Sequence, residues 1–425
     1  MGEQLKVRNF LVLKKVDMDI KKVNVVIGPQ ANGKSVIAKL VYFFQELSAN
    51  FVDSIRKQIT KKELDKTIVE SFESKFPRYS WDGSSFEIDY FIGGISISIY
   101  GERNSRGKTR VKVKYCSDLA RIFLNKKRSY KKRFDQYMEQ EGRRGRIVDL
   151  EHMVLYECVL DPLRESEYSC FFSDSVFIPA TRSFFANLQK NIFTFLASNL
   201  DIDPFLKDFG RLYENSKRMY KDGFLFRRNK GLADELSKSL EAIVSGDYEY
   251  HDEQDWIVSK GKKINLANAS SGQQESLPML LVLCILPLIK NRNSEHGMFF
   301  IEEPEAHLFP TSQGHIVSIL SLLYEHLSTN FFITSHSPYI LSALNNFILA
   351  SDVVRSGGIS ESEFAKLNGG GKPIKFEDVS AYTIESGVSK SICDDEYRMV
   401  GGDMLDDISG HFENVMNQLL TLGDN

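Results

Sequence analysis

The feature that most constrains the fold of this chain is a glycine-rich loop between an apolar segment and a helical pattern. The loop, Gly28–Ser35, has the sequence GPQANGKS and fits the pattern G-x-x-x-x-G-K-[ST]. Val23–Ile27 before it is typical of a buried strand, and Lys34–Leu47 after it carries apolar side chains at helical spacing. This order predicts an α/β fold with a phosphate site at the helix start. An incidental glycine turn would not need both flanks.

The loop contains the residue types that a triphosphate requires. Several backbone N–H groups must point inward, which glycine-rich turns allow, and the start of the following helix adds a favourable dipole. We expect Lys34 to reach the β- and γ-phosphates of ATP and the Ser35 hydroxyl to hold Mg²⁺. The predicted nucleotide-binding residues are Gly28, Pro29, Gln30, Ala31, Asn32, Gly33, Lys34 and Ser35.

A second candidate element is an apolar strand that ends in two carboxylates. Met298–Glu302 is followed directly by Glu303. At the carboxyl end of a strand, one acid can take a water of Mg²⁺ and the next can orient the attacking water. We therefore assign Glu302 to the metal and Glu303 to catalysis. Two such acids alone would more commonly be exposed helix caps, but the glycine loop upstream favours the catalytic interpretation.

A third element, with the sequence SSGQQE, precedes a strongly apolar helix pattern. Hydroxyls and a glycine at a helix start describe a phosphate site, and they describe a good helix cap equally well. Two phosphate-binding helix starts far apart in one chain suggest that they meet across a dimer. The residues assigned to the second start, facing the partner's nucleotide, are Ser270, Ser271, Gly272, Gln273 and Gln274.

A histidine follows the next buried strand pattern. The segment Ile333–Pro338 is ITSHSP, with His336 at the end of the strand. A histidine in this place can hydrogen-bond the γ-phosphate or the attacking water. A lone histidine at a strand end is usually structural, but the order of the four motifs favours a catalytic role.

Taken in this order, the four motifs resemble those of the ABC ATPase superfamily, including its SMC and RecF relatives. The resemblance makes Gly28–Ser35 the Walker A loop, Ser270–Gln274 the signature, Phe299–Glu303 the Walker B strand and His336 the switch histidine. It implies an ABC/SMC-like P-loop core, with a mixed sheet, an antiparallel β-subdomain, a basic insertion and a helical insertion. The cofactors it implies are ATP and Mg²⁺.

A narrower resemblance is to the OLD (overcoming lysogenization defect) family and related anti-phage ATPases. It rests on SSGQQE, on EEPEAHL at Glu302–Leu308, on TSHSPYIL at Thr334–Leu341 and on FIPATR within Val176–Arg182. Glu302 stands where most ABC proteins have Asp, and Gln273 replaces the second signature glycine. No Q-loop glutamine can be assigned, and Arg182 is the candidate near that place. Residues expected to support the site are Arg182, Glu305 and His307.

The C-terminal part departs from the OLD nucleases, which continue into a Toprim nuclease domain. Only 89 residues follow His336, and none forms the D-x-D pair that a Toprim centre needs. Asp394–Glu396 and the run Asp403, Asp406 and Asp407 have the wrong spacing. The chain resembles the ATPase half of a split system, as in PARIS, Septu-type and retron-linked modules. That implies a separate effector such as a Toprim or HNH nuclease, and a phage protein as a possible trigger.

Charge is distributed unevenly. Residues 103–146 hold sixteen lysines and arginines against four acids, whereas residues 376–425 hold eleven acids against two bases. Three interpretations of the basic segment stay open: a nucleic-acid patch, a solvated helix face, or a docking site for the acidic tail or a protein partner. Its aromatic residues fall on the apolar face, which favours core packing. The candidate patch is Lys126, Lys127, Arg128, Lys131, Lys132 and Arg133.

The composition also indicates the cellular compartment. The five cysteines are scattered without a CxxC pair, which argues against a zinc site or disulfide framework. The longest apolar run, Leu277–Ile289, contains two prolines and is shorter than the roughly 20 residues of a membrane span. The N-terminus has no signal-peptide pattern. We expect a cytoplasmic ATPase without a membrane segment.

The expected organisation has five parts, and the function two main alternatives. The parts are a lobe with Walker A (1–100), a basic insertion (101–175), a core strand with a helical insertion (176–245), a lobe with signature, Walker B and switch histidine (246–350) and an acidic C-terminal subdomain (351–425). We expect a homodimeric or larger ATPase that holds and releases an effector in anti-phage defence. The alternative is a RecF- or SMC-like clamp on DNA; a third option is a scaffold that turns ATP over very slowly.

Overall fold

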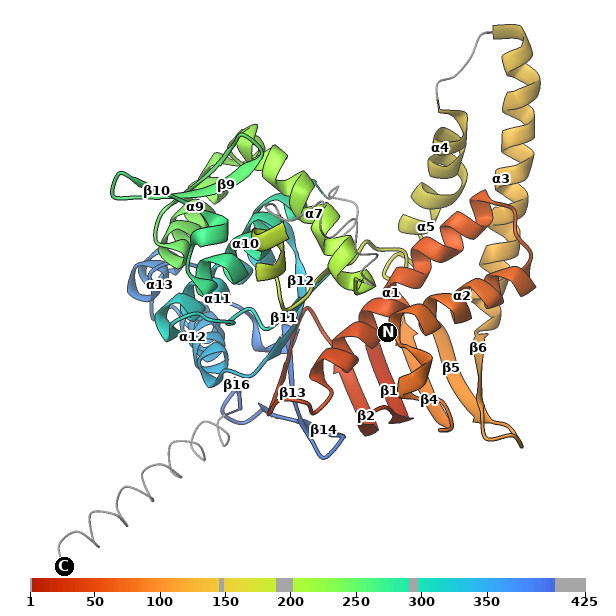
Figure 1. Ribbon diagram of the computed structural model, residues 1–425, viewed down its shortest axis with the longest axis horizontal. Helices are drawn as coiled ribbons and strands as arrows, with labels where there is room; N and C mark the ends of the chain where they lie inside the picture. Colours follow the sequence, from red (N-terminus) through yellow and green to blue (C-terminus); the bar gives the residue numbers. More distant parts are fainter. Residues whose placement is uncertain (1, 145–148, 189–201, 290–296, 402–425) are drawn as a thin grey trace, which may run out of the picture.

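The protein is built on one large mixed sheet with helices on both faces (Figure 1). A computed structural model describes residues 2–144, 149–188, 202–289 and 297–401. Eleven strands follow the order β6-β5-β4-β1-β2-β14-β13-β3-β12-β11-β7. The mixed α/β fold expected from the sequence is confirmed, and the antiparallel β-subdomain is a continuous part of the main sheet.

The glycine loop, the Glu302–Glu303 pair and His336 lie at the ends of strands in the parallel half of the sheet. Its strands are β3 (Val23–Ile27), β7 (Val176–Ile178), β11 (Met298–Glu302), β12 (Asn330–Ser335) and β13 (Val379–Glu385). Neighbours in the order β13-β3-β12-β11-β7 all pair in parallel. Strands buried on both faces are continuous apolar runs, which explains why these segments are recognisable in the sequence.

Alternate residues of these strands enter two different cores, because successive side chains of a strand point to opposite faces. Phe299 and Ile301 of β11 pack into one core, whereas Met298 and Phe300 pack into the other. Helices cover both faces. The second core includes α1 (Lys34–Arg56) and α2 (Lys61–Lys75); the first includes α7 (Pro204–Lys221), α8 (Phe224–Arg228), α9 (Lys230–Val244), α10 (Ser271–Ile289), α11 (Pro310–Leu327), α12 (Pro338–Arg355) and α13 (Glu361–Asn368).

The antiparallel half contains the N-terminal hairpin and a meander. Its strands are β1 (Glu3–Phe10), β2 (Leu13–Ile20), β4 (Phe86–Ile92), β5 (Ile95–Arg103) and β6 (Thr109–Tyr115). Strands β5 and β6 form an antiparallel hairpin. Helix α2 and strand β4 were not expected, although β4 alternates buried and exposed residues along its length. A small second sheet is formed by β8 (Asp247–His251), β9 (Gln254–Ser259) and β10 (Lys262–Asn265).

A helical arm projects from the antiparallel half (Figure 1). It consists of α3 (Ser117–Arg144), α4 (Leu150–Leu155), a π-helical turn at Tyr156–Leu160 and α5 (Asp161–Arg164). The expected helix at 117–141 is therefore present and longer. Part of the expected helical stretch 184–244, namely residues 189–201, lies outside the described residues.

The C-terminal segment differs most from expectation. We expected residues 351–425 to form an acidic C-terminal subdomain. Instead, β13 lies beside β3 in the main sheet, and β14 (Val388–Ser391) joins it to β2. The physical reason is that β13 is buried along six of its seven residues, so it is a core strand. A hairpin of β15 (Cys393–Asp394) and β16 (Met399–Val400) follows; residues 402–425, with Asp403, Asp406 and Asp407, lie outside the described part.

Candidate nucleotide site

Three of the four expected motifs follow strands of the parallel half of the sheet, whereas the signature segment follows β10 of the small second sheet. Because β3, β11 and β12 are parallel neighbours, their carboxyl ends meet at one edge. The Gly28–Ser35 loop follows β3, Glu302 and Glu303 end β11, and His336 follows β12. This edge is where α/β proteins bind ligands.

The Gly28–Ser35 loop has the backbone conformation that its glycines permit. Gly33 has φ of 91° and Gly28 has φ of 145°, and Ala31 is also left-handed with φ of 62°. A Cβ on Gly33 would lie 2.6 Å from Leu13 Cδ2 at the start of β2. Helix α1 then begins at Lys34, and the loop lies at its N-terminus. The local geometry is that of an anion-binding helix start.

The loop is held from the C-terminal strand as well. The Asn32 side-chain amide donates to the Ile384 carbonyl at 3.2 Å. A Cβ on Gly28 would be 3.4 Å from Thr383 Oγ1. Both partners lie on β13, which sequence reasoning had placed in a separate subdomain. The pattern VSAYTI at the start of β13, an apolar run bounded by Asp378 and Glu385, is the feature that could have identified a buried strand.

Lys34, His336 and Glu303 form a chain of contacts. The Lys34 ammonium donates to the carbonyls of Gly28 at 2.7 Å and Pro29 at 2.6 Å, and lies 3.1 Å from His336 Nδ1. His336 Nε2 lies 3.1 Å from Glu303 Oε1. Burial lowers the pKa of Lys34, and the carboxylates of Glu303 and Glu305 oppose that shift. Walker A, Walker B and the switch histidine therefore meet through side chains of one chain.

Glu303 is held in an unusual backbone conformation. Its φ of 45° lies in the left-handed region, which is rare for residues other than glycine. Its N–H donates to the Thr334 carbonyl of β12 at 2.9 Å, which fixes the turn at the end of β11. Strain of this kind occurs often at functional sites, where the surrounding structure enforces it.

Glu302 is buried beside the Ser35 hydroxyl. Its Oε2 accepts from the Ala180 N–H at 3.2 Å, and burial raises the pKa of Glu302 while hydrogen bonds from Ala180 and Ser35 oppose that shift. Its Oε1 is buried without a hydrogen-bond partner among the described residues. An unpartnered carboxylate oxygen next to a serine hydroxyl fits a small divalent cation with oxygen ligands. Among the described residues, no three His, Cys, Asp or Glu side chains form a metal site. Phosphate oxygens would have to complete the shell.

Glu305 and His307 make different contacts near the site. Glu305 Oε1 accepts from the Ser335 hydroxyl at 2.8 Å and from the His336 N–H at 2.6 Å, so it fixes the turn that presents His336. His307 has φ of 58°, and its carbonyl lies 2.7 Å from the position of a Cβ on Gly272. The turn after β11 therefore packs closely against the Gly272 backbone at the start of α10.

Arg182 is completely buried, and its guanidinium is directed at main-chain carbonyls. It donates to the carbonyls of Glu302 at 2.7 Å and Glu303 at 2.9 Å, to Pro179 at 2.8 Å and to Glu275 at 2.8 Å. Its own N–H donates to Glu275 Oε2 at 2.9 Å. With these contacts Arg182 ties the end of β11 to helix α10. Its partner is Glu275, which sequence reasoning did not single out.

The signature segment has two kinds of residue. Ser270 and Ser271 are exposed at the start of α10. Ser270 and Gln273 cap each other, since the Ser270 N–H donates to Gln273 Oε1 at 3.0 Å. Gln273 also donates to the Val244 carbonyl at 2.7 Å, and Gln274 donates to Leu266 at 3.1 Å. The segment therefore forms a helix cap and also exposes two serine hydroxyls. The side chains of Gln273 and Gln274 bind carbonyl groups of their own chain.

The basic patch is only partly available. Lys127 donates to the Ile59 carbonyl at 2.7 Å, Lys126 to Cys158 at 3.3 Å, and Arg133 pairs with Glu157 at 2.6 Å. Arg128, Lys131 and Lys132 are exposed. The aromatic rings of Phe123 and Tyr130 are buried, as their apolar face predicted. Figure 1 shows α3 at the upper right and β16 at the lower left of the centre, so these two elements are well separated within the chain.

Helix α10 is the one described helix whose length and composition could allow it to cross a membrane. Two thirds of its apolar window, 67%, is buried inside the protein. Leu277 and Leu281 are fully buried in the first core, between α7, α9 and the sheet. The helix is thus accounted for as a core element.

Comparisons with known proteins give one family match. Residues 173–341 match the family described as AAA ATPase domain, and curated protein sequences give no match. Solved structures with similarity over 92% of this chain include an SMC head bound to the C-winged helix domain of ScpA (12% identity, TM-score 0.39, 96% of that chain). Others are the SMC head domain from Thermotoga maritima (10%, 0.36, 98%) and the recombination mediator RecF (11%, 0.32, 98%). The family match indicates an ATPase domain over residues 173–341.

Proposed function

We propose that this protein binds and hydrolyses Mg-ATP, with the chemistry divided among the three side chains that meet at the sheet edge. The supporting observation is the contact chain from Lys34 through His336 to Glu303. Lys34 neutralises the β- and γ-phosphates, Glu303 orients and deprotonates the attacking water, and His336 hydrogen-bonds the γ-phosphate or that water. His336 already contacts both other groups, so it links phosphate binding to catalysis.

The residues that would hold Mg²⁺ are Ser35 and Glu302. Bound there, the metal would neutralise charge on the β- and γ-phosphates. The hydroxyl of Ser35 and the unpartnered Oε1 of Glu302 supply oxygen ligands, and Mg²⁺ sites with one or two carboxylates plus phosphate oxygens are common. An isolated buried carboxylate is unfavourable, so a cation bound by Glu302 would be stabilising.

Arg182 and Glu305 act in this proposal as positioning residues. Arg182 fixes the main chain of Glu302 and Glu303, and Glu305 fixes the main chain of His336. A catalytic water is oriented only when its base is held within a fraction of an ångström. Glu275 binds Arg182 and so connects the end of β11 to α10, the helix that begins with the signature segment.

The active unit in this proposal is a homodimer or a larger homo-oligomer with composite sites. Ser270 and Ser271 are exposed at the start of α10, where a partner's nucleotide can approach. Large apolar side chains are exposed beside the motifs: Val12 at 51%, Phe309 at 73% and Tyr339 at 52%. Exposed apolar groups beside a site favour a protein interface. A signature serine of one protomer would then bind the γ-phosphate held by its partner.

In the cell, we propose a cytoplasmic sensor or scaffold ATPase of anti-phage defence that holds a separate effector and releases it according to nucleotide state. The supporting features are the OLD-like sequences around Glu302 and His336. The second candidate is a RecF- or SMC-like clamp on DNA, favoured by the exposed Arg128, Lys131 and Lys132. Purification from the native operon separates them, since a copurifying nuclease supports the first candidate and copurifying DNA the second.

The Glu303→Gln variant tests the catalytic proposal. The amide keeps the shape but cannot accept a proton, so we expect normal ATP binding, turnover lowered by about 10²–10⁴-fold and an ATP-dependent dimer in light scattering. Glu325→Gln, which changes an exposed glutamate of α11, is the matched control. Turnover within about twofold of the unmodified protein would assign the base to another residue.

A further inference from the structure

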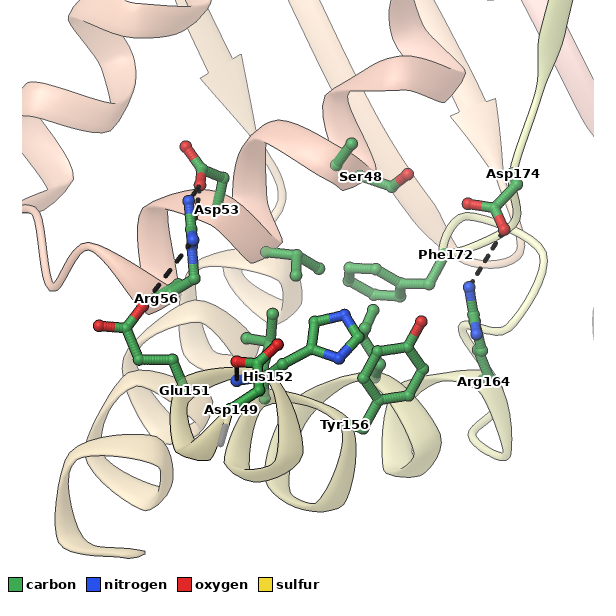
Figure 2. Close-up of a pocket in the computed structure, with 14 residues that line it drawn as sticks. Ser48, Asp53, Arg56, Asp149, Glu151, His152, Tyr156, Arg164, Phe172 and Asp174 are labelled. Carbon is green, nitrogen blue, oxygen red and sulfur yellow. Dashed lines mark hydrogen bonds and ion pairs between the residues drawn. The ribbon is translucent and has the colours of Figure 1, made fainter. Parts of the chain in front are cut away.

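A cleft with a volume of about 480 Å³ lies beside the second half of α1 (Figure 2). Helix α1 forms one wall, α4 and the π-helical turn form the opposite wall, and Phe172 and Asp174 of the loop before β7 close one end. Its volume is in the range of ligand pockets, roughly 300–1,000 Å³. No residue of the four motifs lines it, so it is separate from the nucleotide site.

The middle of the cleft is apolar and aromatic. Val52, Leu155 and Phe172 supply apolar surface, and the rings of His152 and Tyr156 lie 4.7 Å apart in the centre of Figure 2. Tyr156 remains 38% exposed. Such a surface can cover the apolar stem of a ligand and present an aromatic face to a cationic group.

The charged groups at the edges leave surplus negative charge. Arg56 pairs with Asp53 at 2.7 Å, and Arg164 pairs with Asp174 at 3.1 Å. Glu151 lies 3.9 Å from the guanidinium of Arg56, and Asp53 is shared between Arg56 and Lys57, whose ammonium lies 2.6 Å from it. Asp149 accepts only the His152 N–H and has no ion pair with a described residue.

The opposite end of the cleft has an unused donor. Arg164 donates from Nη2 to Asp174, but its Nε is buried without a hydrogen-bond partner among the described residues. Because that nitrogen is buried, a ligand in the cleft cannot contact it without rearrangement, and the Arg164–Asp174 pair leaves this end without surplus charge. Figure 2 shows Arg164 at the end opposite Glu151, with His152 and Tyr156 between them.

The wall that carries Tyr156 has irregular backbone. Residues Tyr156–Leu160 form a π-helical turn between α4 and α5. Such turns are rare and occur frequently at functional sites. Tyr156 and Leu160, the two ends of this turn, both line the cleft.

We propose that this cleft binds a basic peptide segment of a partner protein. A lysine or arginine side chain of that segment would lie across His152 and Tyr156, with its charge at Asp149 and Glu151. This occupant supplies the positive charge that the surplus carboxylates attract, which an anionic ligand would not.

Two walls of the cleft continue directly into the nucleotide site. Helix α1 begins at Lys34, and its rise of about 1.5 Å per residue places Ser48 about 21 Å from that lysine. The Phe172–Asp174 loop leads into β7 and then to Ala180, which donates to Glu302. The Ser175 hydroxyl donates to Gln45 of α1 and joins the two walls. Resting on the proposed ATPase, we infer that the bound segment also changes the rate of hydrolysis.

The test uses the full chain without nucleotide and three acetylated, amidated pentapeptides. Their sequences are Gly-Gly-X-Gly-Gly, with arginine, lysine or the neutral isostere citrulline at X. We expect the arginine and lysine peptides to bind at least tenfold more tightly than the citrulline peptide in calorimetry. The double variant Asp149→Asn/Glu151→Gln should lose that preference. The variant Asp395→Asn/Glu396→Gln, which removes two exposed charges from the β15–β16 hairpin, should keep it.

Three results would overturn the proposal. They are absence of binding by the cationic peptides, equal binding of the citrulline peptide, or equal loss in both double variants, which would show charge attraction without a site. Ala49→Trp, which fills the cleft from α1, should abolish binding while thermal unfolding shows a folded chain. Binding is measured without ATP, so it stands or falls independently of the ATPase. An ATPase rate that changes with the arginine peptide tests only the link through α1 and β7.

Discussion

Two helices of this protein begin with the residue types that bind phosphate, and their first turns have different surroundings. At the start of α1, Lys34 is only 4% exposed, and the loop before it is held by β13 and by Leu13. At the start of α10, Ser270 and Ser271 are exposed, and the side chains of Gln273 and Gln274 are bound to their own chain. One start is complete within the protomer, whereas the other needs a ligand from outside it.

Lys34→Ala should have the largest effect, because it removes the side-chain cation of the complete helix start. We expect loss of measurable ATP binding in calorimetry and loss of hydrolysis, since the γ-phosphate loses its P-loop charge. Lys62→Ala, an exposed lysine at the start of α2, is the control and should bind normally. Unchanged affinity in Lys34→Ala would show that α1 is not the phosphate site.

Ser271→Arg should have the next largest effect and should separate the two helix starts. We expect hydrolysis to be lost while a single subunit still binds ATP, because Ser271 would face the partner's nucleotide in the proposed dimer. Ser362→Arg, at an exposed position in the first turn of α13, is the control. A strong loss of ATP binding by the Ser271→Arg monomer would place α10 in the site of its own chain.

Mixing sharpens the same comparison. A heterodimer of Ser271→Arg and Lys34→Ala chains has one composite site with an intact α1 start from one chain and an intact α10 start from the other. We expect part of the ATPase activity to return when the two inactive proteins are mixed. Well-folded mixtures that recover no activity would argue against composite dimer sites.

Arg182→Lys should have a smaller effect, because it loosens the connection between the two starts without removing either. A lysine ammonium cannot reach the carbonyls of Glu275, Glu302 and Glu303 in the geometry of the guanidinium fork. We expect kcat to fall by about 10²-fold, as for a base displaced by 1 Å, with ATP affinity nearly unchanged. Arg211→Lys, with an exposed side chain on α7, is the control. A change in ATP affinity alone would make Arg182 a binding residue.

The two halves of the sheet also differ in how well the sequence predicts them. The parallel half is recognisable because strands such as β3 and β12 are continuous apolar runs with motifs at their ends. The glycine loop, Glu302, Glu303 and His336 were found for this reason. Strand β13 was missed because the polar residues Ser380 and Thr383 weaken its apolar pattern. Its pairing partner, β3, lies more than 350 residues away in the sequence. Local patterns contain no information on that pairing.

Side-chain partners were the other part that sequence reasoning could not supply. Arg182 was expected near the Q-loop position, yet its contacts with Glu275 and the end of β11 depend on three segments that only the fold brings together. Similarly, the basic patch was defined by charge alone. The contacts of Lys127 with Ile59 and of Arg133 with Glu157 arise from the packing of α3 against neighbouring segments.

The smallest effect is expected for the basic patch, where phosphate would be bound by side-chain charge without a helix start. If the patch binds duplex DNA, the log–log slope of affinity against salt should be about −0.9 for each phosphate neutralised. Replacing the six residues of the patch by Gln should flatten that slope and lower the affinity for all DNA sequences alike, because phosphate contacts have no base specificity.

Arg128, Lys131 and Lys132 are exposed, whereas Lys126, Lys127 and Arg133 have partners in their own chain. The triple variant of the exposed three should therefore reproduce nearly the whole change, with Lys126, Lys127 and Arg133 as the matched control triple. We favour a protein partner for this face; weak DNA binding by the unmodified protein, with partner copurification lost in the exposed triple variant, would agree with that. A tight, salt-dependent DNA affinity that the exposed triple variant loses, with oligomeric assembly intact, would contradict it.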